Sequence, residues 1–168
     1  MTKLFVLVLA TLAACASTAP TKGTPTMTTD TKPETMGPHL KIKLTTVYVD
    51  DQDKALRFYT EVLGFVKKAD VSRGAFRWLT VASRAEPDGT ELQLARSDNP
   101  AGKAYQDAMF QQGQPAIMFY TDDVQAEYER LKARGVEFTM PPTDVIMSKI
   151  AMLKDTCGNF VQVTQLMH

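Results

Sequence analysis

Side chains that could carry acid–base or nucleophilic chemistry are scarce in this chain of 168 residues. Histidine occurs only as His39 and His168, and the only thiols are Cys15 and Cys157. A Ser–His–Asp or Cys–His arrangement needs a histidine beside the nucleophile, and neither histidine qualifies. Cys157 could be a modestly activated thiol, although the sequence favours a plain turn residue in "DTCGN". The sequence therefore gives little support to covalent catalysis.

The first fifteen residues predict export. Lys3 precedes the apolar run "LFVLVLATL", and the run closes in "LAAC", which is the order of charged, apolar and small residues in a secretory signal. Residues 1–14 are therefore expected to be a signal peptide. The "LAAC" phrase also resembles the bacterial lipoprotein box, which implies cleavage before Cys15 and its acylation. An ordinary signal peptide that leaves Cys15 unmodified is the alternative.

The lipoprotein resemblance implies a location in the cell envelope. Ala16 after the modified cysteine implies the outer membrane, facing the periplasm. Residues 15–39 are rich in Thr, Pro and Ser and are expected to form the acylated Cys15 and a disordered tether. The N-terminal lipid is expected to be the only membrane contact, because no later apolar run approaches the ~20 residues of a spanning helix.

The balance of charge argues against nucleic acid as a partner. Lysine and arginine together number 19, and aspartate and glutamate also number 19. Such a chain has no broad basic surface for a phosphate backbone.

One sequence unit occurs twice after residue 40. "VYVDDQDKALRFYTEVLGF" (47–65) and "FYTDDVQAEYERLKARGVEF" (119–138) each run from an apolar strand through two aspartates into an amphipathic helix. Aspartate is a good N-cap because its carboxylate accepts hydrogen bonds from free backbone N–H groups. The helices are expected to begin at Asp51 and Asp122 and to end at Gly64 and Gly135, since glycine suits a left-handed C-cap.

Three strands are predicted to follow each helix, so each unit reads β-α-β-β-β. Pro141 and Pro142 are expected to end the first of these strands in the second unit, and a helix over 100–113 is expected to connect the units. This predicts an α+β domain over 40–168, with modules at about 42–97 and 115–166. The predicted strands after the helices are 65–71, 75–82, 90–96, 136–140, 148–154 and 159–166.

The two units and the closing phrase "DTCGNFVQV" (155–163) resemble the glyoxalase/bleomycin resistance/dioxygenase superfamily, also called vicinal oxygen chelate proteins. The resemblance implies that paired βαβββ modules form an eight-stranded, cup-shaped sheet. In enzymes of that superfamily, residues at four strand positions hold a divalent metal inside the cup, and the metal acts as a Lewis acid on the substrate.

The resemblance places these four positions at Leu44, about Ala95, Ala116 and Gln162. Leucine and alanine donate no lone pair, and one amide oxygen is a weak ligand for a divalent ion. We therefore expect neither a metal nor another cofactor. A displaced ligand set built on Glu91, which shares the strand parity of Ala95, is the alternative.

Strand alternation predicts which side chains face the inside of the cup. Aromatic, thioether and amide groups there would suit a neutral or cationic small organic molecule. The plainer interpretation is that the aromatic members simply belong to the core. The predicted ligand-binding residues are Tyr48, Trp78, Gln93, Met118, Tyr120 and Gln162.

These observations favour a metal-free, membrane-tethered protein that binds a small organic molecule and is not an enzyme. Two alternatives stay open. One is a glyoxalase-like or dioxygenase-like enzyme with a displaced metal set, and the other is a protein-interaction module of the envelope. The sequence also leaves open whether two chains pair as a homodimer.

Overall fold

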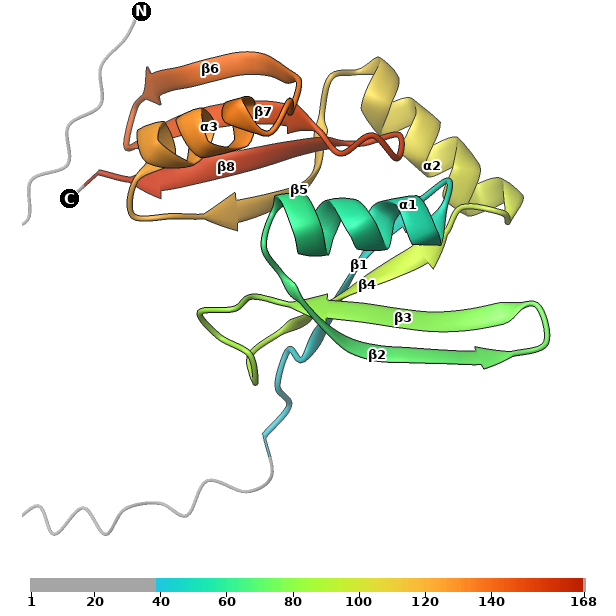
Figure 1. Ribbon diagram of the computed structural model, residues 1–168. Coiled ribbons are helices and arrows are strands. Elements are labelled where there is room, and N and C mark those ends of the chain that lie inside the picture. Colours follow the sequence, from blue (N-terminus) through green and yellow to red (C-terminus); the bar gives the residue numbers. More distant parts are fainter. Residues whose placement is uncertain (1–38, 168) are drawn as a thin grey trace, which may run out of the picture. The chain divides into compact units, whose positions relative to one another are not determined.

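The computed structural model describes residues 39–167 as two four-stranded mixed sheets and three α-helices (Figure 1). The predicted signal peptide and most of the predicted tether, including Cys15, lie outside the described residues. The strands are β1 (Leu44–Val49), β2 (Val66–Arg73), β3 (Phe76–Ala82), β4 (Glu91–Arg96), β5 (Pro115–Tyr120), β6 (Phe138–Val145), β7 (Ser148–Lys154) and β8 (Phe160–Leu166). The helices are α1 (Gln52–Arg57), α2 (Pro100–Gln111) and α3 (Val124–Ala133), and α1 continues as a π-helix, η1 (Phe58–Val62).

The two sheets repeat one topology. The first has the order β1-β4-β3-β2 and the second has the order β5-β8-β7-β6. In each sheet the strand before the helix pairs in parallel with the last strand of the module, and the other pairs are antiparallel. The predicted α+β class and the paired βαβββ modules are therefore confirmed, with α2 as the predicted connection.

Aspartate caps begin both module helices, although not at both predicted residues. The carboxylate of Asp51 accepts hydrogen bonds from the backbone N–H groups of Asp53 and Lys54, both at 2.9 Å. In the second module Asp123, and not Asp122 as predicted, accepts the equivalent bond from Ala126 N at 2.9 Å. Only one of two adjacent aspartates can occupy the N-cap position, so Asp122 is left free of this role.

The prediction that Pro141 and Pro142 end a strand is wrong, because β6 continues through both to Val145. The strand lies at the edge of its sheet, where one row of N–H groups needs no partner and proline is tolerated. Its pairing with β7 shifts between Met140 and Thr143, and this irregularity contains the two prolines. An edge position and a bulge therefore allow what a central strand would not.

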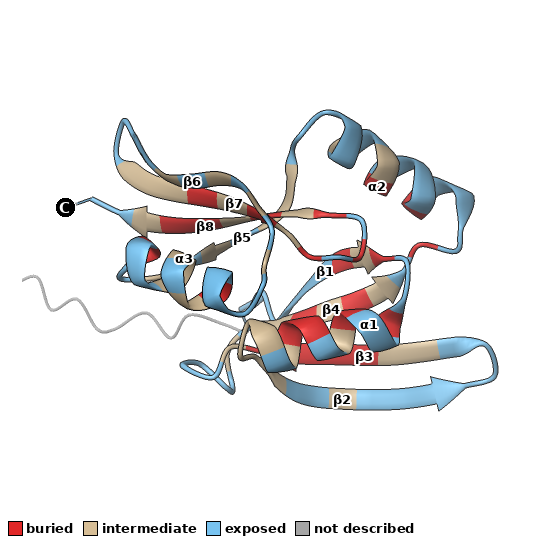
Figure 2. Ribbon diagram, turned by 45° about the horizontal axis from the view of Figure 1, so that its top comes forward, coloured by how far each residue is buried: buried red, intermediate tan, exposed pale blue. Residues whose placement is uncertain are grey.

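One hydrophobic core joins the two modules. The helix-facing side chains of both sheets and the buried sides of α1 and α3 form a single cluster. Figure 2 marks the buried residues in red along the strands and helices of both modules. Tyr59 of η1 lies at the centre of this cluster, fully buried, with its ring 6.4 Å from that of Phe119 in the second module. Edge-to-face aromatic pairs stabilise the folded state beyond the effect of burying their surface. This contact therefore makes the helix of the first module part of the packing of the second.

The turn at 155–159 ties the modules together through a buried carboxylate. Asp155 is fully buried and accepts hydrogen bonds from Cys157 N (2.8 Å), Asn159 N (2.9 Å) and Asn159 Nδ2 (2.7 Å). It also accepts one from the Tyr59 hydroxyl of the first module at 3.3 Å. Burial raises the pKa of Asp155, while these donors act to lower it.

The same turn contacts β1, α1 and α2. Asn159 Nδ2 donates to Tyr48 O at 2.9 Å, and Gln106 Nε2 of α2 donates to both Tyr48 O (3.0 Å) and Cys157 O (2.8 Å). The ammonium group of Lys54 in α1 donates to Thr156 O. Four segments from three distant parts of the sequence therefore share one hydrogen-bonded network.

Replacing Tyr59 with phenylalanine tests the hydrogen bond between Tyr59 and Asp155 that joins the modules. Tyr59→Phe keeps the packed ring but leaves Asp155 one donor short, so the free energy of unfolding should fall by about 1–2 kcal/mol. Urea unfolding of the domain comprising residues 39–168 measures it. Tyr128→Phe is the matched control, because the Tyr128 hydroxyl bonds only to the exposed Lys132 side chain, at 3.1 Å. Equal losses in the two variants would contradict the role given to Asp155.

Candidate functional site

The strand register shows which residues of the last strands hold equivalent places in the two modules. In the second module Met118 pairs with Gln162, and in the first module Thr46 pairs with Gln93. Met118 and Thr46 hold equivalent places, each five residues before the aspartate that caps the following helix. Gln93, and not Ala95, is therefore the counterpart of Gln162, so both last strands carry a glutamine there.

The residues at the four positions that the resemblance assigns to metal ligands do not fit a divalent metal. Leu44, Ala116 and the two glutamines supply no carboxylate and no imidazole, and the glutamines lie on two different sheets. Among residues 39–167 no three His, Cys, Asp or Glu side chains come together in a way that could hold a metal ion. Glu91, the basis of the alternative set, accepts a hydrogen bond from the Thr80 hydroxyl at 2.6 Å.

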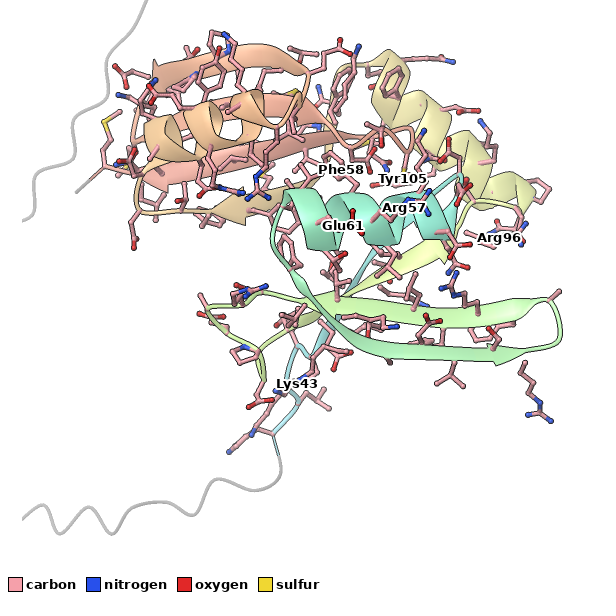
Figure 3. The ribbon with its side chains drawn as sticks, in the orientation of Figure 1. Lys43, Arg57, Phe58, Glu61, Arg96 and Tyr105 are labelled. Carbon is pink, nitrogen blue, oxygen red and sulfur yellow. The ribbon has the colours of Figure 1, made fainter. Side chains whose placement is uncertain are left out.

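Three of the predicted ligand-binding residues lie on the first sheet, on the face opposite its helix. The Thr46 hydroxyl donates to Gln93 Oε1 at 3.1 Å, and Trp78 is half-buried beside Phe76, with the ring centres 6.5 Å apart. The ring of Tyr48 is covered by α2. Tyr105 of α2, which is labelled in Figure 3, lies edge-on to this ring with the ring centres 6.2 Å apart. A Cβ added at Gly102 would lie 3.0 Å from the same ring.

The other three lie on the second sheet. Met118 and Gln162 are neighbours across β5 and β8, and the row continues through Met152 of β7 to Met140 of β6. Gln162 Nε2 donates to the Thr164 hydroxyl at 3.0 Å. Thioethers on both sides of an amide make this face soft and largely apolar, which suits contact with aromatic rings.

The structure does not gather all six residues at one point of a single chain. The helix-facing sides of both sheets share one core, so the opposite faces, which carry the six residues, lie on the outer sides of the sheets. No hydrogen bond or aromatic contact among residues 39–167 joins the first three to the last three. A single site that contains all six residues therefore cannot form within one chain.

An open cleft of about 1,100 Å³ lies between the modules, and two of the six, Met118 and Tyr120, line it. Tyr120 is 67% exposed and Met118 is 51% exposed. The opposite wall comes from β3, the start of β4 and the connection between them. The cleft is also lined by residues that the sequence prediction did not select, namely Thr45, Phe65, Val81, Glu86, Thr90, Leu92, Ile117, Phe119, Asp122 and Gln165.

Phe65 and Phe119 are the most informative of the missed residues. Their rings lie 4.9 Å apart and connect the end of η1 to β5. Both stand at the ends of the repeated phrases, and strand alternation did not select either of them as facing the inside of the cup. Their half-buried position in the cleft depends on how the modules pack, which strand parity alone does not reveal.

Comparison with known families decides the relationship. The sequence model of the Glyoxalase/Bleomycin resistance protein/Dioxygenase superfamily matches residues 41–163. The chain belongs to this superfamily. It is 52% identical over 126 residues to the uncharacterized protein YurT of Bacillus subtilis, covering 75% of this chain and 99% of YurT. It is 36% identical over 117 residues to YetH of the same organism, covering 67% of this chain and 88% of YetH.

Solved structures of the superfamily share the fold. UcmS2 is 30% identical with a TM-score of 0.66, and the match covers 76% of this chain and 98% of that one. TnmS3, an antibiotic binding protein from a Streptomyces species, is also 30% identical, with a TM-score of 0.62 and coverage of 78% and 98%. A superfamily member from Sphaerobacter thermophilus is 26% identical, with a TM-score of 0.59 and coverage of 76% and 98%.

Cys157 lies in the turn at 155–159, which joins the modules, and it does not line the cleft. It is fully buried, and burial together with the nearby Asp155 carboxylate raises its pKa to about 12. Its thiol contacts Asp51 O at 3.9 Å. A buried thiol that stays protonated at neutral pH is a poor nucleophile, which favours the interpretation of Cys157 as a turn residue.

The reactivity of this thiol is a direct test. In the domain comprising residues 39–168, Cys157 should react with a disulfide reagent at least about 100-fold more slowly than free cysteine, and should react fully in denaturant. Absorbance of the released thiolate measures both rates. The control is Ala85→Cys in a Cys157→Ala background, because Ala85 is exposed in the β3–β4 connection. Native Cys157 reacting as fast as the control would contradict its burial.

Proposed function

We propose that this protein binds a small organic molecule without a metal, and that the inter-module cleft provides the binding surface. The observation that carries the proposal is the cleft itself. It has a volume of about 1,100 Å³ and presents aromatic, thioether and hydroxyl groups. Such a mixture is typical of sites that hold organic ligands by apolar contact and a few hydrogen bonds. The similarity to TnmS3 supports the proposal, since that protein binds an antibiotic.

The side-chain chemistry supports binding more than catalysis. The metal-ligand positions carry Leu44, Gln93, Ala116 and Gln162, so the residues for Lewis-acid chemistry are lacking at those positions. The described cleft has no histidine and no cysteine that could act as a base or nucleophile.

A second copy of the chain is the partner that we propose for the uncovered sheet faces. Val71 (62% exposed) and Phe76 (58% exposed) lie on the outer face of the first sheet, and Met118 lies on that of the second. A homodimer related by a two-fold axis could bring the first face of one chain to the second face of its partner twice. Gln93 and Gln162 would then meet across the interface.

We further propose that the protein acts in the cell envelope, attached to the outer membrane by acyl chains on Cys15 and facing the periplasm. The support is the sequence order of Lys3, the apolar run and "LAAC". No helix among residues 39–167 is long and apolar enough to cross a membrane.

Two other functions would give different results in the same experiment. An enzyme with a displaced metal set would use Glu91, whose carboxylate is held by Thr80. A protein-interaction module would use the exposed faces and would leave the cleft without a small molecule.

Native mass spectrometry of residues 39–168 purified from cell extract tests the binding function. We expect an organic mass retained on one or two chains and no stoichiometric zinc, nickel or iron. Tyr120→Ala should reduce the fraction of chains that carry the mass about 5-fold, because an aromatic contact is lost. Tyr105→Ala on α2 is the matched control, since Tyr105 is 52% exposed outside the cleft. A bound metal would favour the enzyme, and an empty cleft with a captured protein would favour the interaction module.

Substitution of the proposed acylation site tests the membrane attachment. In a bacterial host, the full chain should fractionate with outer membranes, and Cys15→Ser should move it to the soluble or unprocessed fraction, because stable attachment needs acyl chains. Immunoblotting of the fractions measures the change. Cys157→Ser, which leaves the proposed acylation site intact, should stay with the membrane. Soluble protein in the unsubstituted strain would contradict the anchor.

A further inference from the structure

We propose that the cleft selects cationic aromatic ligands, through the carboxylates of Glu86 and Asp122 at its rim; this inference rests on the proposed binding function. These two side chains are the charged residues that line the cleft, and no lysine or arginine does so among the described residues. A rim with charge of one sign favours a ligand of the opposite sign.

The carboxylate of Asp122 can contact a ligand because the neighbouring Asp123, and not Asp122, caps α3. The position of Asp122 follows β5 directly, and Asp123 caps α3 by accepting from Ala126 N. The Asp122 carboxylate takes part in no salt bridge or side-chain hydrogen bond among residues 39–167, and the residue is exposed. A ligand cation would therefore meet a carboxylate that needs no existing ion pair broken.

Glu86 faces the cleft from the other module. It lies in the β3–β4 connection, where its backbone carbonyl accepts from Gly89 N at 3.0 Å. That bond fixes the turn while leaving the side-chain carboxylate without a salt bridge among the described residues. Asp88, two residues further on, is different, because its carboxylate pairs with Lys68 at 3.3 Å.

The two arginines near the cleft, Arg84 and Arg130, bind other groups of the protein. Arg130, beside the same part of β5, forms a salt bridge with Glu127 at 2.6 Å and donates to Val62 O at 3.1 Å. Arg84 donates to Gly64 O at 3.4 Å. Neither guanidinium lines the main cleft, so they do not neutralise its two rim carboxylates.

The cleft walls supply the aromatic part of the preference. The rings of Phe65 and Phe119 are tilted against each other by 51°, with centroids 4.9 Å apart, and Tyr120 extends the aromatic surface toward Asp122 along the chain. Met118 adds a thioether, which contacts aromatic rings favourably. A flat ring system carrying a positive charge could contact ring faces and carboxylates at once.

Three fused-ring probes of similar size separate charge from shape: the aminoacridinium cation, neutral acridone and anthracene carboxylate. Fluorescence titration uses residues 39–168, which contain the whole described core. We expect the cation to bind tightest, and its affinity to fall as salt rises from about 20 to about 300 mM. The double variant Glu86→Gln/Asp122→Asn should weaken binding of the cation about 5-fold and leave acridone binding unchanged.

The control is the double variant Glu61→Gln/Glu129→Gln, which removes the same charge from exposed helical positions outside the cleft (Glu61 is labelled in Figure 3). It should bind all three probes as the unsubstituted protein does. If the three probes bind equally and both double variants behave alike, charge selection is overturned while the binding function stands. If no probe binds, the proposed function is overturned and the inference falls with it.

Discussion

The buried carboxylate of Asp155 is the constraint on which the arrangement of this protein depends. It satisfies three donors of its own turn and the hydroxyl of Tyr59 from the other module. Removing a partner from a buried polar group leaves a desolvated group without compensation, which costs far more than the bond contributes in water. The two modules, each with its own sheet, are therefore held at a fixed junction that α2 reinforces through Gln106.

That junction determines where the cleft proposed as the binding surface lies. The modules meet through their helix-facing sides, so the outer sheet faces are left without partners within one chain and a cleft opens between the modules. Phe65 and Phe119 serve both purposes, because they pack against the core and also form part of the cleft wall. The same packing that stabilises the fold thus supplies the apolar surface of the proposed site.

Two of the four positions that correspond to metal ligands in the superfamily carry hydrogen-bonded amides, and the other two carry the aliphatic residues Leu44 and Ala116. Gln93 is held by Thr46 and Gln162 by Thr164, and each occupies the same place in its module. A glutamine fixed by a neighbouring hydroxyl retains one polar group for a ligand but cannot act as a strong metal ligand.

The sequence by itself determined the repeated βαβββ units and the α+β class, because strand alternation, aspartate caps and glycine ends are local signals. The superfamily followed from the resemblance of the repeated phrases and of "DTCGNFVQV" to a known family. Local signals could not decide which of two adjacent aspartates caps a helix, and this choice leaves Asp122 at the cleft. They also could not place Gln93 opposite Thr46, or cover Tyr48 with α2 while exposing Tyr120. Register and exposure are decided by contacts between segments far apart in the chain, so only the tertiary structure fixes them.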